Sequence, residues 1–325
     1  MNAPVPDRAA GDAAVVVESV SRRMGATEAL RDVSFEAGRG ELFGFIGPDG
    51  AGKTTLLRIL ATLLVPDRGS ARVLGLDVVE QLWRIRPRLG YMAGRFSLYP
   101  DLSVEENLRF YASVFGTTVD AARRKIGPIY SQLEPFRGRR AGALSGGMKQ
   151  KLALSCALVH HPDLLLLDEP TTGVDAVSRR EFWELLGELR AGGLTILVST
   201  PYMDEAVRCN RVALMHGGAI LATDTPAALA LAFSRPLLSV RTADRYGAIL
   251  ALRRFEHVHT VFPFGETLHY ADRRTEGSPP SIAVEVERFL VASGLPAEVE
   301  PVGPSIEDTF MDMVSDVSRP EGRIR

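Results

Sequence analysis

The sequence is poor in cysteine and in long apolar runs. Its two cysteines, Cys156 and Cys209, lack the spacing of a metal site, and we expect both to be buried free thiols. The longest stretch without a charged residue, from Ala191 to Met203, falls short of the roughly 20 apolar residues that a transmembrane helix needs. If the chain works at a membrane, another subunit is expected to supply the spans.

Neither sign of charge dominates the sequence. The 38 lysines and arginines nearly balance the 40 aspartates and glutamates, and the net charge is -2 with histidine neutral. A nucleic-acid-binding domain normally carries a basic patch. The short basic clusters here, Arg84 to Arg88 and Arg137 to Arg140, are expected to be solvated faces. We therefore predict no nucleic-acid partner.

The length of 325 residues predicts about two domains. The opening residues are rich in Pro, Ala, Gly and Asp and lack the apolar region of a secretory signal, so a disordered tail is expected there. Composition changes again near Ser234, Arg235 and Pro236. The predicted division is a tail over 1–14, a first domain over 15–233, a linker over 234–236, a second domain over 237–317 and a tail over 318–325.

The first domain has the pattern of an α/β fold. Apolar runs typical of buried parallel strands occupy 42–46, 164–167 and 195–199, and shorter strand-like segments lie near 15–20 and 33–35. A helix is expected from Lys53, with leucines at helical spacing as far as Leu63 and Leu64. The region from about 95 to 160 is expected to be mostly helical, with a capping box at Ser103 to Glu106.

The second domain is expected to be a small α+β domain without a catalytic motif. Its strand-like segments are 237–241, 258–262 and 267–270, and its helical segments are 243–255 and 281–292. A last helix is expected to open with a cap formed by Ser305 and Asp308.

A glycine-rich turn between the strand at 42–46 and the following helix matches G-x-x-x-x-G-K-[ST]. Such a loop turns its backbone amides inward, and the helix presents free amides and the positive end of its dipole to an anion. The lysine reaches the β- and γ-phosphates of a nucleotide, and the hydroxyl ligates Mg²⁺. The predicted phosphate-binding residues are Gly47, Pro48, Asp49, Gly50, Ala51, Gly52, Lys53, Thr54 and Thr55, with Thr54 also a metal ligand.

Two acidic residues follow the apolar strand at 164–167. Asp168 and Glu169 stand at the carboxyl end of this strand, at the sheet edge where nucleotides bind. We predict Asp168 as a metal ligand and Glu169 as the catalytic residue that orients or deprotonates the attacking water. No asparagine is followed by the lysine of an NKxD motif, which disfavours a GTPase, whereas a nucleotide kinase remains open at this point.

A third motif, LSGGMKQ, spans residues 144–150. A serine and two glycines at a helix start form an anion-binding end. The motif resembles the signature LSGGQ of ATP-binding cassette (ABC) proteins, with Met148 at the fifth position. In that family the signature closes over the nucleotide of the opposite subunit, which implies this role for Ser145, Gly146 and Gly147. Asp175, in the sequence GVD, resembles the D-loop residue and is counted with the nucleotide-binding set.

The resemblance covers residues 15–233 and implies a P-loop NTPase sheet with a helical subdomain and an antiparallel β subdomain. It implies the ATP-binding and ATP-hydrolysing subunit of an ABC exporter, with ATP and Mg²⁺ as cofactors and ATP-driven dimerisation coupled to transport. The second domain resembles, more loosely, the appendage of multidrug- and polysaccharide-export ATPases. Expected partners are a separate membrane permease and a second ATPase subunit. The expected location is cytoplasmic, on the inner face of the cell membrane.

Three positions depart from the family pattern. The aromatic residue that stacks on adenine falls at Met24, which packs less rigidly. The Q-loop glutamine and the switch histidine fall at Gly94 and Pro201, and neither has a polar side chain. Thr200 and Pro201 are expected instead to cap and start the next helix. These losses predict ATP binding with slow hydrolysis, unless another group substitutes.

Two other functions fit the same motifs. The residues at Gly94 and Pro201 also favour a nucleotide-binding regulatory half-cassette with weak or no hydrolysis, whose partner hydrolyses ATP. A soluble ABC ATPase outside transport usually has two cassettes in one chain or long coiled coils, and neither pattern is present. The intact Glu169 favours a working ATPase.

Overall fold

The computed structural model describes residues 13–94 and 97–318, which form two compact units divided between Thr225 and Pro226. Helix α7 (Pro226–Leu231) belongs to the second unit because it packs against the last helix, α10 (Ile306–Ser318). The Thr309 hydroxyl donates to the Leu229 carbonyl at 2.8 Å. The segment expected as a linker, 234–236, therefore lies inside the second unit.

The predicted tails fall almost entirely outside the described residues. Ala13 and Ala14 belong to the first strand, and Ser318 ends α10. Within 13–94 and 97–318, no helix combines the length and the apolarity that crossing a bilayer takes. Cys156 and Cys209 are buried free thiols, as predicted, and burial raises the pKa of both.

In the first unit, six described strands form a mainly parallel sheet in the order β10-β9-β3-β8-β7-β6. Every residue of β3, β7 and β8 is buried, as expected for strands covered on both faces. The edge strand β10 runs antiparallel to β9. The bounds are β3 Leu42–Ile46, β6 Leu89–Met92, β7 Leu164–Asp168, β8 Thr195–Thr200, β9 Arg211–His216 and β10 Ala219–Asp224.

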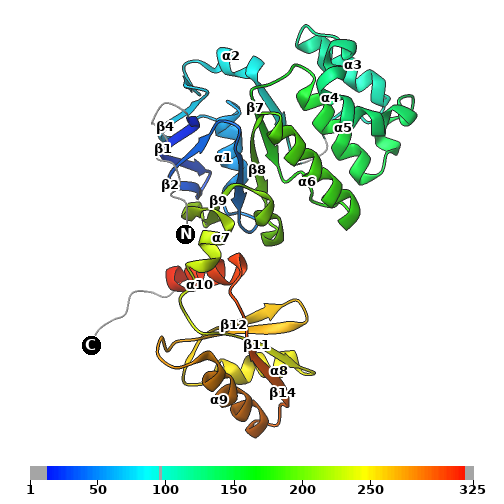
Figure 1. The fold of residues 1–325 in the computed structure, drawn as a ribbon. Coiled ribbons are helices and arrows are strands. Elements are labelled where there is room, and N and C mark those ends of the chain that lie inside the picture. The colour runs from blue at the N-terminus through cyan, green and yellow to red at the C-terminus, as the bar shows by residue number, and fades with distance from the viewer. Residues whose placement is uncertain (1–12, 95–96, 319–325) are drawn as a thin grey trace, which may run out of the picture. The chain divides into compact units, whose positions relative to one another are not determined.

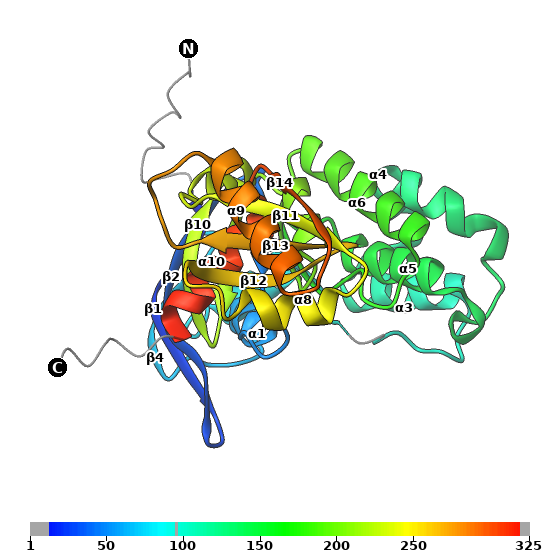
Figure 2. The ribbon, with the colours of Figure 1, turned by 90° about the horizontal axis from the view of Figure 1, so that it is seen from below.

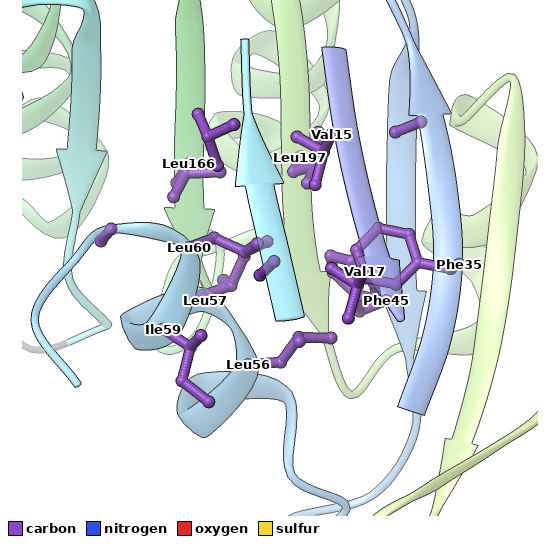
Figure 3. Packing of buried hydrophobic residues seen from close by; sticks show 14 of the residues in the cluster. Val15, Val17, Phe35, Phe45, Leu56, Leu57, Ile59, Leu60, Leu166 and Leu197 are labelled. Atoms are coloured by element: carbon purple, nitrogen blue, oxygen red, sulfur yellow. The ribbon is translucent and has the colours of Figure 1, made fainter. Parts of the chain in front are cut away.

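Four further strands form an antiparallel sheet in the order β2-β1-β4-β5, and helix α1 (Lys53–Leu60) packs against both sheets. Figure 3 shows Leu56, Leu57 and Leu60 of α1 on the side of the strands that carry Phe45 and Leu166, and Ile59 belongs to the same buried cluster. Burying each such side chain stabilises the fold by about 1.5–3 kcal/mol, so the start of α1 is held firmly. The bounds are β1 Ala13–Met24, β2 Thr27–Gly38, β4 Arg68–Val73 and β5 Leu76–Asp77.

The expected continuation of α1 to Leu63 and Leu64 is wrong. The helix ends at Leu60, and Thr62 adopts a left-handed backbone with φ of 60°. Arg86 holds this residue through Nε to Thr62 Oγ1 at 2.9 Å and Nη2 to Thr62 O at 3.1 Å. The helix thus closes in a Schellman motif, in which the Thr62 amide donates to the Ile59 carbonyl and the Leu63 amide donates to the Arg58 carbonyl, and Arg86 holds the left-handed residue.

The predicted helical region is present. Figure 1 shows α3, α4 and α5 gathered at one side of the six-stranded sheet. The expected capping box is confirmed, since Ser103 Oγ accepts from the Glu106 amide and the Glu106 carboxylate accepts from the Ser103 amide. The bounds are α2 Leu82–Ile85, α3 Val104–Val114, α4 Val119–Leu133, α5 Gly146–Leu158 and α6 Ala176–Ala191, with short 3₁₀ helices η1 Arg86–Arg88, η2 Glu134–Phe136, η3 Ala141–Ala143 and η4 Met203–Arg208.

The second unit is a βαββαβ arrangement with an antiparallel sheet in the order β12-β13-β11-β14. Helices α8 and α9 cover one face, as Figure 2 shows, and α10 packs on the sheet through two histidine–aspartate pairs. His259 Nε2 lies 2.6 Å from Asp312 Oδ1, and His269 Nδ1 lies 2.6 Å from Asp308 Oδ1. The bounds are β11 Leu237–Thr242, α8 Arg245–Leu252, β12 Val258–Phe264, β13 Thr267–Asp272, α9 Pro279–Ala292 and β14 Ala297–Pro301.

Candidate functional site

The glycine-rich loop joins the end of β3 to the start of α1. Gly52 is the N-cap of α1 with φ of 101°, a backbone conformation that L side chains rarely adopt. A Cβ at Gly47 would lie 2.1 Å from the Met215 carbonyl oxygen, so the neighbouring strand leaves room for glycine alone. The loop is thus packed against the protein on one side while its amides begin a helix on the other.

Lys53 is 3% exposed and is held by the loop that it follows. Its Nζ donates to the carbonyls of Gly47 at 2.7 Å and Pro48 at 3.0 Å. The same Nζ lies 3.3 Å from Oε1 of Glu169. The cation is therefore fixed at the point where β3 and β7 end.

The acidic pair lies next to this lysine. Asp168 is the last residue of β7, and its Oδ1 accepts hydrogen bonds from Thr54 Oγ1 at 2.9 Å and Ser199 Oγ at 2.8 Å. Glu169 follows with φ of 49°, and its amide donates to the carbonyl and the hydroxyl of Ser199. The backbone turn at Glu169 directs its carboxylate towards Lys53.

A cavity of about 410 Å³ lies over the loop. Met24 stands at its rim and is 45% exposed, and Thr27 and Ala29 reach the cavity from β2 after a two-residue turn. Sequence reasoning missed Thr27 and Ala29, although the turn after Met24 was a usable signal. The cavity is lined by Met24, Thr27, Ala29, Asp49, Gly50, Ala51, Gly52, Lys53, Thr54, Thr55 and Glu169.

The remaining predicted residues form a second cluster that does not line this cavity. Ser145 is the N-cap of α5, and Asp175 is the N-cap of α6. The two helix starts adjoin, since a Cβ at Gly147 would lie 2.5 Å from the Ser178 hydroxyl oxygen. Hydrogen bonds from Ser178 and Val177 lower the pKa of Asp175. Within one chain, therefore, the signature and the loop residues stay apart.

Of the positions that depart from the family pattern, Gly94 lies beside the acidic pair. A Cβ at Gly94 would lie 3.0 Å from the Asp168 carbonyl oxygen. The expectation that Thr200 and Pro201 start a helix is wrong, because Thr200 ends β8 and the 3₁₀ helix η4 begins at Met203 after the N-cap Tyr202. The Thr200 hydroxyl instead accepts from the Tyr202 amide and donates to buried Glu205.

The donor set fits a magnesium nucleotide. Thr54 and Asp168 supply hard oxygen ligands 2.9 Å apart beside the cavity. The described residues hold no group of three or more His, Cys, Asp or Glu side chains suited to a metal. Where Mg²⁺ binds with a nucleotide, one or two protein oxygens and the phosphates share the ion.

This fold and this cavity define the class of mononucleotide-binding P-loop proteins. Residues 30–172 match the family described as ABC transporter. The probable multidrug ABC transporter ATP-binding protein YbhF of Escherichia coli K12 is 42% identical over 218 residues, which are 66% of this chain and 38% of YbhF. The daunorubicin resistance ATP-binding protein DrrA3 of Streptomyces coeruleorubidus is 32% identical over 318 residues, which are 95% of this chain and 98% of that protein.

A solved structure of the same fold is the dimeric post-hydrolysis state of the ATP-binding cassette MJ0796 bound to ADP and Pi. It superposes with a TM-score of 0.58 at 26% identity, covering 65% of this chain and 98% of that chain. The chain belongs to the ABC transporter family of ATP-binding proteins, as its signature motif predicted. The predicted P-loop NTPase fold is confirmed, and the matched segment spans well under half of YbhF.

Proposed function

We propose that this chain binds Mg²⁺-ATP in the cavity over the P-loop, hydrolyses it, and drives export through a separate membrane permease. The observation that carries the proposal is the meeting of Lys53, Thr54, Asp168 and Glu169 beside one cavity. The chain would then work at the cytoplasmic face of the cell membrane. Its relatives include proteins named for multidrug transport and daunorubicin resistance.

Each residue of this group has a chemical role in the proposal. Lys53 exchanges its contact with Glu169 for the charged oxygens of the β- and γ-phosphates. Glu169, released from the lysine, is free to orient and deprotonate the attacking water. Thr54 and Asp168 would hold Mg²⁺, which neutralises phosphate charge when it is bound. Met24, at the rim, would pack against the base.

The second cluster supports dimerisation. Ser145, Gly146 and Gly147 form an anion-binding end at the start of α5 that the chain's own cavity does not use, and Asp175 caps the adjoining start of α6. We propose that this end closes over the nucleotide of a second ATPase subunit. The likeness to MJ0796, solved as a dimer with ADP and Pi, supports this arrangement.

An apolar groove of about 380 Å³ is the proposed contact with the permease. It lies between β6 and the helices α3 and α5, and its lining includes Tyr91, Met92, Leu98, Tyr111 and Phe115. Met92 and Ser97 of the lining flank Gly94 on both sides in sequence. A cytoplasmic helix of the permease with an apolar face would bury this lining and touch the loop at Gly94.

The test of nucleotide binding compares the chain with Lys53→Ala. Removing the cation should weaken Mg²⁺-ATP binding at least about tenfold, because a charge-assisted hydrogen bond contributes about 1.5–3 kcal/mol. Titration with a fluorescent ATP analogue measures the affinity. Arg68→Ala, an exposed change on β4, is the control and should bind normally. Unchanged affinity in a folded Lys53→Ala variant would contradict the assignment.

Gly94 and Pro201 favour a second candidate, a regulatory half-cassette whose partner performs the hydrolysis. Neither residue offers a polar side chain to the γ-phosphate. Affinity purification from membranes separates the candidates. A permease with a second, different ATPase subunit supports the half-cassette, whereas a permease with this chain as its sole ATPase supports the first proposal.

A further inference from the structure

Ser199 touches both residues of the acidic pair. It lies at the carboxyl end of β8, is 0% exposed, and pairs in the sheet with Asp168. Its hydroxyl donates to Asp168 Oδ1 at 2.8 Å and accepts from the Glu169 amide at 3.0 Å. A single buried hydroxyl thus joins the proposed metal ligand to the proposed catalytic residue.

The hydroxyl orients the Asp168 carboxylate. Oδ1 receives hydrogen bonds from Ser199 and from Thr54, which together fix the rotation of the group. Thr54 is itself a proposed metal ligand, so its hydroxyl would bind both Asp168 and the metal ion. Ser199 is outside the proposed ligand set, and its hydrogen bond need not change when Mg²⁺ arrives. It is therefore the lasting constraint on Asp168.

The same hydroxyl stabilises the unusual backbone of Glu169. A non-glycine residue with φ of 49° is in the left-handed region, which surrounding contacts must stabilise. The Glu169 amide is held by both the carbonyl of Ser199 at 3.1 Å and its hydroxyl at 3.0 Å. This conformation brings the Glu169 carboxylate within 3.3 Å of Lys53 Nζ.

We infer that Ser199 is a positioning residue for magnesium binding and ATP hydrolysis, acting through Asp168 and Glu169. The inference rests on the proposed function. The chain has no polar side chain at Gly94 or Pro201, the two neighbouring positions that would otherwise help order the metal and the water. The end of β8 supplies an ordering group from position 199 instead.

Three variants separate the hydroxyl from the volume of the side chain. Ser199→Ala removes the hydroxyl without adding atoms. Ser199→Thr and Ser199→Val add the same bulk, and only threonine keeps a hydroxyl. For each variant, the affinity for a fluorescent ATP analogue is measured in EDTA and across a MgCl₂ titration, followed by steady-state hydrolysis and thermal unfolding.

Mg²⁺ tightens the binding of the ATP analogue. Loss of the hydroxyl should raise the Mg²⁺ concentration that gives half of this effect about 10- to 100-fold in the Ala and Val variants, as expected for groups that orient metal ligands. The Thr variant should stay within about threefold of the parent chain. Affinity in EDTA should be equal in all four proteins, because Ser199 does not line the cavity.

Two results would overturn the role of Ser199. One is parent-like Mg²⁺ dependence in the Ala variant, and the other is equal loss in the Thr and Val variants at equal thermal stability. If the Thr and Val variants both unfold, the Mg²⁺ dependence of the Ala variant alone decides whether Ser199 has this role. A parent chain that binds no ATP would refute the proposed function itself, and with it this role.

Discussion

Glycine at position 94 has a steric reason. The chain passes the end of β7 so closely that any Cβ at this position would meet the Asp168 carbonyl oxygen at 3.0 Å. That distance is shorter than most carbon–oxygen contacts, so a larger residue must displace the loop or the strand. The residue expected in the family, glutamine, does not fit this backbone without such a shift.

Gly94→Gln should therefore not restore hydrolysis. A shift of a few tenths of an ångström at Asp168 is expected to lower the rate about three- to tenfold, since a misplacement of about 1 Å can cost about a hundredfold. Gly94→Ala is the matched control, because it adds the Cβ without the amide. Steady-state ATPase assays on the purified transporter should show a loss in both variants.

Pro201→His in the same assay should give less than a tenfold gain, alone or combined with Gly94→Gln. Thr200 already bonds the Tyr202 amide and Glu205, so the segment is ordered without a histidine. A tenfold or larger gain from the double variant would show that the missing side chains limit the chemistry.

At the residue scale, the motifs predicted the residues that meet beside the cavity, but not the buried serine that holds two of them. Lys53, Thr54, Asp168 and Glu169 were predictable because their spacing relative to strand and helix is specific to phosphate binding. Ser199 was missed because one serine in an apolar strand has no sequence signature. Its role arises only from the parallel pairing of β7 with β8.

Helix α10 is attached to its sheet through charged side chains. Asp308 is buried; burial opposes its ionised form, but the hydrogen bonds from His269 and Ser305 outweigh this and lower its pKa. Asp312 pairs with His259 and also with Arg235 at 3.2 Å. The helix is thus fixed to the sheet by two carboxylates one turn apart.

Asp308→Asn should lower the free energy of unfolding of the second unit by about 1–3 kcal/mol at pH 7. Because the pKa of Asp308 is lower in the folded state, its carboxylate stabilises the fold fully at pH values above the ordinary pKa of about 3.9. This stabilisation is lost as the pH falls through the lower pKa of the folded state. The difference between parent and variant should therefore shrink at pH 3.

Urea unfolding of the full chain, followed by circular dichroism, measures this difference. Tryptophan fluorescence identifies the unfolding transition of the first unit, because Trp83 and Trp183 both lie in that unit. Glu287→Gln, which changes an exposed residue of α9, is the control and should leave the free energy of unfolding unchanged at both pH values. An Asp308→Asn difference that stays constant from pH 7 to pH 3 would contradict the role of this carboxylate.

At the element scale, periodicity predicted which elements exist better than where they end. The strands at β3, β7 and β8 were evident because each contains an uninterrupted apolar run. The end of α1 was missed because the left-handed residue that closes the helix is Thr62 and not the usual glycine, and Arg86 holds it from outside the segment. Strand β14 was missed because it is short and carries two glutamates, and its place is set by pairing with β11.

On the scale of the whole molecule, the proposed dimer makes a direct prediction. Glu169→Gln keeps the hydrogen-bonding shape of the side chain but removes the base, so ATP should be bound and not cleaved. The variant should sediment as a dimer with Mg²⁺-ATP and as a monomer without it. Sedimentation velocity measures the change.

Ser145→Tyr in the same variant is the control for the interface. Ser145 is exposed, so a tyrosine there should block closure over a second nucleotide without disturbing the core. This double variant should stay monomeric while it still binds ATP. A Glu169→Gln chain that remains monomeric with ATP, both with and without the permease, would refute the mechanism.

The separation of the signature cluster from the cavity has a genetic consequence. In a two-subunit sandwich, each chain gives its cavity to one composite site and its signature to the other. A chain inactivated at Lys53 and a chain inactivated at Ser145 would then assemble, when coexpressed, with both lesions in one site and none in the other. Two inactive alleles of this kind would complement each other, whereas two alleles altered at Lys53 would not.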